Sequence, residues 1–386
     1  MFNASESAIN LIKHLVTEDS SEINMNRPAN GFENFNDLFG KIAAAPGLTP
    51  LAPFMYHKLR NRKLESSVPV DILAKLKNAY YVTIFSNLKK LYATGKVLEA
   101  LQQASILAIP LKGITLIEFL YQDPGIRPMA DVDLLIKPQD FQVIKTVLES
   151  VGYLFIDSYR GSYNFIDREN KVSLDLHSQF LRYEAMFNID YHEIYARLRK
   201  VTFNGQVHAK VLCPEHQLIH IAMHLAPGLY TQLNLLNLLD LYSLLSNQQS
   251  PFDWEYLVDF ARRSKVSSYI YAPLFLYTQL FNMGIPERIL HQLGEKISYR
   301  KAQYIQNDYL ETILNGGILT SKIFLERLIW VDGTANKLKL LRMAFLPDRR
   351  EIARRYDTSE NSFKLYVLYL LRLWQLLRDH SHQKTL

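Results

Sequence analysis

The chain has 386 residues, of which 48% are hydrophobic and 21% charged, and its formal net charge at pH 7 is +6. This is the composition of an ordinary globular protein, long enough for two or three packed subdomains, and its mild basicity suits an acidic partner. The single cysteine, Cys213, excludes an internal disulfide and a cysteine-rich zinc site. Because no signal peptide or membrane-spanning stretch is visible, we expect a cytoplasmic protein.

The hydrophobic pattern divides the chain into three parts. Apolar residues recur at helical spacing in the first third, strands and helices alternate in the middle, and helical spacing returns from Cys213 onward. We therefore predict a mixed α+β fold, in which a small α/β core is flanked by helical regions. The predicted parts are an N-terminal helical region at residues 1–104, the core at 105–212 and a C-terminal helical domain at 213–386.

The expected core elements are short and are punctuated by turn residues. Pro138 and Asp140 favour the start of a helix, and Gly152 is typical of a helix end. The expected strands are Ser105–Leu111, Asp131–Ile136, Tyr153–Ile156, Ser162–Asp167 and Val172–His177, and the expected helices are Gly113–Leu120 and Phe141–Val151.

The most informative feature is a pair of aspartates, Asp131 and Asp133, at the start of one predicted strand. Side chains at positions i and i+2 of a strand point to the same side, so these carboxylates converge. Two buried carboxylates repel each other unless a cation lies between them. Mg²⁺ is the natural choice, because it binds carboxylate oxygens and is often shared with substrate phosphates. The pair is typical of a phosphoryl- or nucleotidyl-transfer site.

A third carboxylate and several phosphate-binding candidates complete this prediction. Two-metal nucleotidyl transfer requires three carboxylates, and Asp175 interrupts an otherwise apolar alternation in the strand 172–177. Lys112 and Arg127 would neutralise a triphosphate, and Gly113 would allow the backbone to approach it. The Thr115 hydroxyl would add a contact near the start of the following helix. Asp175 could instead cap a strand or pair with Arg160 or Arg182.

Together these motifs are similar to those of the uncharacterised nucleotidyltransferase family of the DNA polymerase β superfamily. The matching segments are Leu-Lys-Gly at 111–113, Arg-x-x-x-Asp-x-Asp at 127–133 and Asp-Leu-His at 175–177. The helical continuation at 214–224 and the Asp-Trp pair at 253–254 extend the likeness over nearly the whole chain. Most of the superfamily has serine as the second turn residue, where this chain has glycine after Lys112, and Lys112 is our candidate for the missing phosphate contact.

The resemblance implies a polymerase β-like core that transfers a nucleoside monophosphate from a triphosphate such as ATP to an acceptor hydroxyl, releasing pyrophosphate. It also implies two Mg²⁺ ions, for which Mn²⁺ could substitute, held by Asp131, Asp133 and Asp175 as catalytic residues. A small molecule, tRNA or protein could be the acceptor, and the oligomeric state is open. Two alternatives remain: a toxin-like member that acts on tRNA or protein, and a catalytically silent binding scaffold.

Two features of the predicted C-terminal helices carry further expectations. His216, His220 and His224 form one stripe of a helix, but no glutamate follows His216 as the zinc motif H-E-x-x-H requires. We expect these histidines to have a structural role between the core and the helical domain. Asp240 lies among leucines, so we expect it to pair with an arginine.

Overall fold

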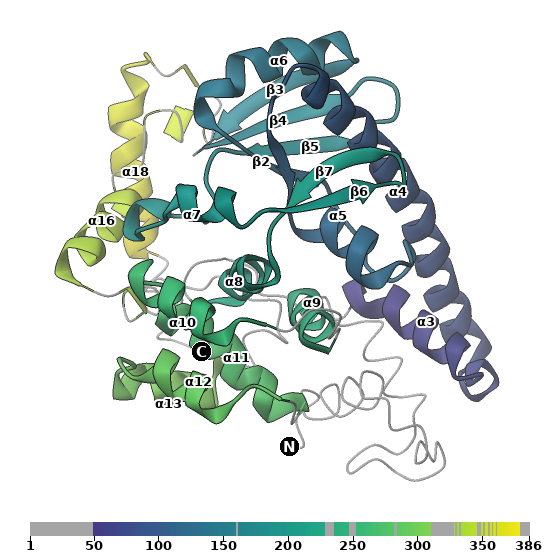
Figure 1. Ribbon diagram of the computed structural model, residues 1–386. Helices are drawn as coiled ribbons and strands as arrows, with labels where there is room; N and C mark the ends of the chain where they lie inside the picture. Colours follow the sequence, from purple (N-terminus) through teal and green to yellow (C-terminus); the bar gives the residue numbers. More distant parts are fainter. Residues whose placement is uncertain are drawn as a thin grey trace.

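The computed structural model describes residues 49–159, 161–227, 235–246, 252–281 and 284–309 and, with shorter gaps, residues 328–378. Its architecture is mixed α+β, as predicted, with a small sheet, a two-stranded hairpin and many helices (Figure 1). Residues 1–48 of the predicted N-terminal helical region lie outside the described residues. In the described part of the chain, no helix is long and apolar enough to cross a membrane.

Two helices precede the sheet. α3 (Ala52–Asn61) begins with Pro53 in its first turn, and α4 (Val70–Gln103) follows Pro69, which stands at its N-cap. The fixed φ of proline suits these positions, where the backbone N–H has no partner inside the helix. α4 has 34 residues and packs against both α3 and the sheet layer. α4 is therefore long enough to contact α3 near one end and the sheet layer near the other (Figure 1).

The main sheet has five strands in the order β1-β2-β5-β4-β3. β2 and β5 pair in parallel, whereas all the other neighbours are antiparallel. The strands are β1 (Ala108–Pro110), β2 (Val132–Ile136), β3 (Tyr153–Tyr159), β4 (Ser162–Asp167) and β5 (Ser173–His177). Between them run α5 (Lys112–Leu116), the π-helical turn η3 (Ile117–Tyr121) and α6 (Phe141–Ser150).

The hairpin of β6 (Arg199–Phe203) and β7 (Val207–Val211) is not among the predicted elements. Asn204 and Gly205 form its turn with φ of 49° and 67°, so both have left-handed backbones. An Asn-Gly pair between two strands is the strongest short-range signal for such a hairpin, because these residues tolerate positive φ. The short helix α7 (Tyr191–Ala196), capped by Asp190, was also not predicted.

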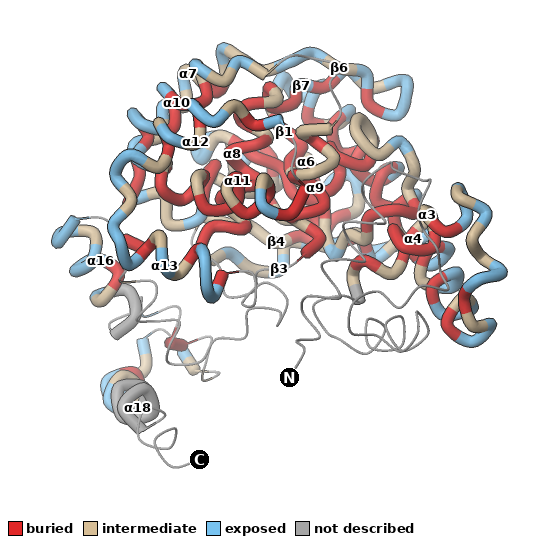
Figure 2. The backbone as a smooth tube through the Cα atoms, turned by 90° about the horizontal axis from the view of Figure 1, so that it is seen from below, coloured by how far each residue is buried: buried red, intermediate tan, exposed pale blue. Residues whose placement is uncertain are grey.

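The C-terminal part is helical, as predicted. Figure 1 shows α8 and α9 directly beneath the sheet layer and α10–α13 beyond them. Figure 2 shows that α8, α9 and α11 run through the most deeply buried region. These elements are α8 (Pro214–Leu225), α9 (Leu235–Ser246), α10 (Trp254–Arg263), α11 (Ser267–Phe281), α12 (Glu287–Gly294), α13 (Tyr299–Asn307), α16 (Thr334–Phe345) and α18 (Lys364–Arg378).

The two faces of β2 belong to different layers. Val132, Leu134 and Ile136 pack into a core that β2 shares with α4 and α6, whereas Leu135 joins the larger core formed with the C-terminal helices. Because side chains alternate along a strand, Asp133 lies on the same face as Leu135. The candidate site is thus on the sheet face that is turned toward the helical domain.

Candidate active site

Strand pairing brings two of the three predicted carboxylates together. In the parallel ladder of β2 and β5, Asp133 is the direct partner of Asp175. β2 begins at Val132, so Asp131 precedes the strand by one residue instead of opening it. Asp131 is not part of the group of close ligand atoms that Asp133, Asp175 and His177 form, although it lies near enough for the charges of Asp133 and Asp175 to act on it. The structure thus brings Asp133 and Asp175 together directly, whereas the role of Asp131 beside them stays a prediction.

Asp133 is the most tightly held of the three. Its Oδ1 atom lies 2.7 Å from Lys112 Nζ and 2.7 Å from His177 Nε2, and the residue is only 6% exposed. Burial alone would raise the pKa of the Asp133 carboxyl, but the Lys112 ammonium and the His177 ring outweigh this and hold it well below its usual range. Asp133 is therefore ionised at neutral pH, as a metal ligand must be.

The Lys112 backbone is strained. Its φ is 51°, which places a non-glycine residue in the left-handed region at the turn from β1 into α5. Such a conformation costs roughly 1–3 kcal/mol and tends to cluster at functional sites. The strained turn directs the Lys112 side chain to Asp133, and this contact gives the strain a role in the site.

Asp175 and Asp131 complete the carboxylate cluster. Asp175 accepts a hydrogen bond from the Ser162 hydroxyl, and its Oδ2 lies 3.4 Å from His177 Nε2. Burial, and next the negative charge of Asp133, raise the pKa of Asp131. Single ligand atoms of Asp133, Asp175 and His177 all lie within 4.8 Å of one another, and theirs is the one such group among the described residues. These side chains could hold a divalent metal ion.

Arg127 connects this site to the helical domain. Its Nε and Nη2 donate to the two carboxylate oxygens of Asp240 at 2.7 and 2.8 Å, and both residues are buried. The expectation that Asp240 pairs with an arginine is confirmed. The remaining nitrogen, Nη1, donates to the Pro128 carbonyl oxygen at 3.3 Å and faces the start of α5, since a Cβ on Gly113 would lie 2.4 Å from it. Gly113 is thus required for the close approach of Arg127.

The loop that ends at Asp131 is fixed from the α4 side. The Asn87 amide donates to the carbonyl oxygens of Pro124 and Arg127, at 2.7 Å each. Near the start of the loop, Asp123 accepts a hydrogen bond of 2.8 Å from the Tyr80 hydroxyl. Buried hydrogen bonds of this kind define the backbone position because each unpaired partner would be costly. The loop therefore presents Asp131 in a defined place.

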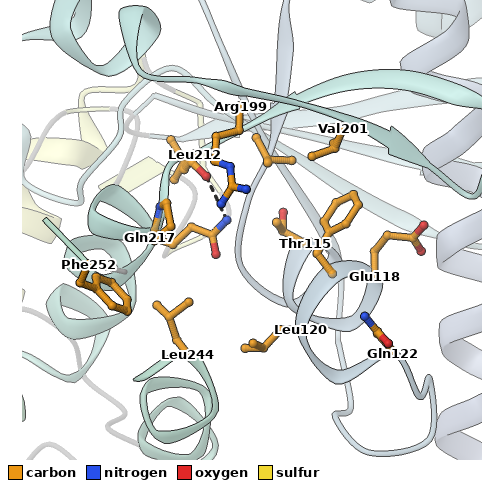
Figure 3. A pocket seen from close by; sticks show the side chains of 13 residues that line it. Thr115, Glu118, Leu120, Gln122, Arg199, Val201, Leu212, Gln217, Leu244 and Phe252 are labelled. Atoms are coloured by element: carbon orange, nitrogen blue, oxygen red, sulfur yellow. Dashed lines mark hydrogen bonds between the residues drawn. The ribbon is translucent and has the colours of Figure 1, made fainter. Parts of the chain in front are cut away.

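A cavity of about 310 Å³ lies between α5–η3, the β6–β7 hairpin and helices α8 and α9. Figure 3 shows Thr115 and Gln217 facing each other across it. The Thr115 hydroxyl is buried and has no hydrogen-bond partner among the described residues. A smaller cavity shares these two residues and is also lined by Lys112. Thr115 thus lines both spaces, three residues after the Lys112 turn.

Comparison with known proteins places the chain in a family. A model of the family described as uncharacterised nucleotidyltransferase matches residues 37–282. The chain belongs to this family. It is accordingly a nucleotidyltransferase, and the resemblance seen in the motifs is confirmed. No match was found among curated proteins.

Two solved structures are similar to this nucleotidyltransferase at low identity. An antigenic nucleotidyltransferase-like protein from Paracoccidioides brasiliensis has 16% identity and a TM-score of 0.34, with 61% of this chain and 97% of that chain covered. A Megavirus polyadenylate synthase has 10% identity and a TM-score of 0.31, with 86% of this chain and 76% of that chain covered.

The three histidines of α8 are placed where the helical domain meets the core. His216 Nε2 lies 2.8 Å from the Tyr256 hydroxyl, and His224 Nδ1 donates to the His220 carbonyl oxygen. Burial lowers the pKa of His216 to about 4 and that of His224 to about 3. The three do not form a metal-ligand group among the described residues. This arrangement agrees with the structural role expected for them.

The sequence interpretation did not include His177 among the site residues, although the structure places it between Asp133 and Asp175. The sequence did contain a signal that His177 belongs to the site. His177 is two residues after Asp175 in β5, so both side chains point to the same face of the sheet. The apolar neighbours Leu174 and Leu176 point into the opposite layer.

Proposed function

We propose that this nucleotidyltransferase moves a nucleoside monophosphate from a nucleoside triphosphate to an acceptor hydroxyl and releases pyrophosphate. The observation that carries the proposal is the side-by-side register of Asp133 and Asp175 on parallel strands, with Asp131 one step before β2 and Lys112 on Asp133. Two adjacent carboxylates with a third just before the strand, and a lysine beside them, suit a reaction in which a polyanion must be bound and its developing charge neutralised.

The donor set fits Mg²⁺, with Mn²⁺ as a possible substitute. Asp131, Asp133 and Asp175 would hold the ions, and they supply the carboxylate oxygens that hard cations prefer. The His177 nitrogen in the same group also suits Mn²⁺. When bound, two such ions would neutralise phosphate charge and align the attacking and leaving oxygens.

The triphosphate would bind at the turn into α5. The Lys112 ammonium is the nearest positive group, and Gly113 and Thr115 follow it in the same helix. Arg127 has committed two of its nitrogens to Asp240, so it would reach the phosphates only through Nη1 beside Gly113. We therefore assign Arg127 mainly to positioning the loop and Lys112 to the phosphate contact.

Asp175 would act on the acceptor. It stands beside Asp133 on the neighbouring strand, and Ser162 and His177 orient its two oxygens. An acceptor hydroxyl placed there would pass its proton toward the Asp175 carboxylate as its oxygen attacks the α-phosphorus. The bond to pyrophosphate would break on the opposite side of that phosphorus.

Calorimetric titration tests the binding half of this proposal. Each of the four ribonucleoside triphosphates is titrated with and without Mg²⁺ into the wild type and into an Asp131→Ala/Asp133→Ala variant. We expect Mg²⁺-dependent binding of at least one triphosphate and its loss in the double variant. Absence of binding under every condition would favour a protein that keeps the fold as a scaffold.

A further inference from the structure

Lys90 of α4 is a buried lysine, and the residues around it do not compensate the cost of burying its charge. The residue is 7% exposed, and its ammonium donates to the Ser86 hydroxyl at 2.6 Å. No carboxylate of the described part of the chain lies within ion-pairing distance of it. A buried ammonium without a close negative partner is costly, so a lysine persists there only with a compensating use.

The position of Lys90 in the helix directs it to the candidate site. Asn87, three residues earlier, donates to the carbonyl oxygens of Pro124 and Arg127. Residues three apart lie on the same side of a helix, so Lys90 belongs to the side of α4 that contacts this loop. The loop runs on to Asp131, whose carboxylate attracts the Lys90 ammonium, although burial has the larger effect and lowers the pKa of Lys90.

The positive side chains described so far are too few to balance the charge of a bound polyphosphate. Lys112 is held by Asp133, and Arg127 is held by Asp240. A triphosphate carries about four negative charges, so it needs more than a single lysine even when metal ions are bound. Lys90 supplies another cation on the side of the site where Asp131 lies.

We propose that Lys90 binds the polyphosphate of the nucleotide from the α4 side, while Lys112 binds it from the α5 side. This inference rests on the proposed function and names a further substrate-binding residue for it. Lys90 would contact the phosphates only, so its contribution should grow with the number of phosphates. In the nucleotide-free protein, the buried charge of Lys90 would lower the free energy of unfolding. A neutral side chain of similar length at this position should therefore make the nucleotide-free protein more stable.

The test compares Lys90→Met with Lys89→Met, a matched control. Lys89 is the adjacent residue in α4, but it is exposed, with its ammonium over the Phe85 ring. AMP, ADP and ATP are titrated into both variants and the wild type in the presence of Mg²⁺. We expect Lys90→Met to weaken ATP binding about tenfold or more, ADP less and AMP least, because one charge-assisted contact is worth about 1.5–3 kcal/mol. Lys89→Met should bind all three as the wild type does.

Thermal unfolding of the nucleotide-free proteins adds a second readout. Lys90→Met should unfold at the wild-type temperature or above it, which a purely structural lysine would not allow. If Lys90→Met does not fold, Lys90→Gln, which can still bond to Ser86, takes its place in the titrations. ATP affinity within about twofold of the wild type, or an equal loss for AMP and ATP, would overturn the proposal. ATP binding by the wild type itself shows that such a result concerns Lys90 and leaves the proposed function standing.

Discussion

The buried pair of Arg127 and Asp240 should be essential to the stability of this nucleotidyltransferase. Asp240→Asn keeps the shape of the side chain and a partner for the Tyr121 hydroxyl, but it removes the charge that balances Arg127. Asp240 is 1% exposed and Arg127 7% exposed, so solvent cannot replace the lost partner. Breaking a buried pair from one side costs about 3–5 kcal/mol, or roughly 4–6 °C in melting temperature for a chain of 386 residues.

The assay is urea or thermal unfolding of four proteins: the wild type, Asp240→Asn, Arg127→Met and the double variant Arg127→Met/Asp240→Leu. The double variant should recover most of the stability, because replacing both charges leaves none uncompensated. A cost below about 1 kcal/mol for Asp240→Asn would refute the reasoning, since that is the range of an exposed pair. Nucleotide titration of the double variant then separates the two possible roles of Arg127, as undiminished binding would make it a positioning residue alone.

Three other results follow from the site. Gly113→Ala should lower the melting temperature, at a cost of about 1–3 kcal/mol, because the added Cβ meets Arg127 Nη1 at 2.4 Å and Met129 Cγ at 2.7 Å. Lys112→Ala should weaken triphosphate binding about tenfold or more and Thr115→Ala less, in calorimetric titration; equal affinities would remove Lys112 from the phosphate site. The free energy of unfolding, measured with urea, should fall as the pH drops from about 6.5 to about 4. In this range His216 binds a proton in the unfolded chain but stays neutral in the folded protein, where it is buried. His216→Phe should reduce this fall by about 3 kcal/mol, and an unchanged pH profile would show that His216 is not its cause.

The parts of the site that depend on local pattern could be predicted from the sequence. Asp133 and Asp175 interrupt apolar segments, and Asp131 stands two residues before Asp133, so side-chain alternation predicts that Asp131 and Asp133 point to the same side. The structure adds that Asp133 and Asp175 are direct partners in a parallel ladder. Which strands are neighbours and in which direction they run depends on contacts between distant segments, and periodicity within a single strand carries no information on either.

Contacts between distant segments could not be predicted in the same way. Arg127 and Asp240 are 113 residues apart, so the sequence indicates only that a buried carboxylate needs a partner. Lys90 was missed for a related reason. Together with Thr83, Asn87 and Thr94 it forms a buried polar stripe along α4, and hydrophobic periodicity alone assigns such a stripe to solvent.

The hairpin was missed although its signal is local. Asn204 and Gly205 form the turn, but the flanking segments 199–203 and 207–211 contain charged residues at exposed positions of short strands. Apolar and polar residues nevertheless alternate in 207–211, so this alternation and the turn residues were both evidence for the hairpin.

The most direct test of nucleotidyl transfer follows the label of the nucleotide. The protein is incubated with Mg²⁺, nucleoside triphosphates labelled at either the α- or the γ-phosphate, and separate acceptor pools of tRNA, protein and small hydroxyl compounds. We expect the α-label to appear in one pool with release of pyrophosphate, the γ-label to stay out of every pool, and transfer to be lost in Asp175→Asn. Transfer of the γ-label alone, or α-transfer undiminished in Asp175→Asn, would contradict the proposed chemistry.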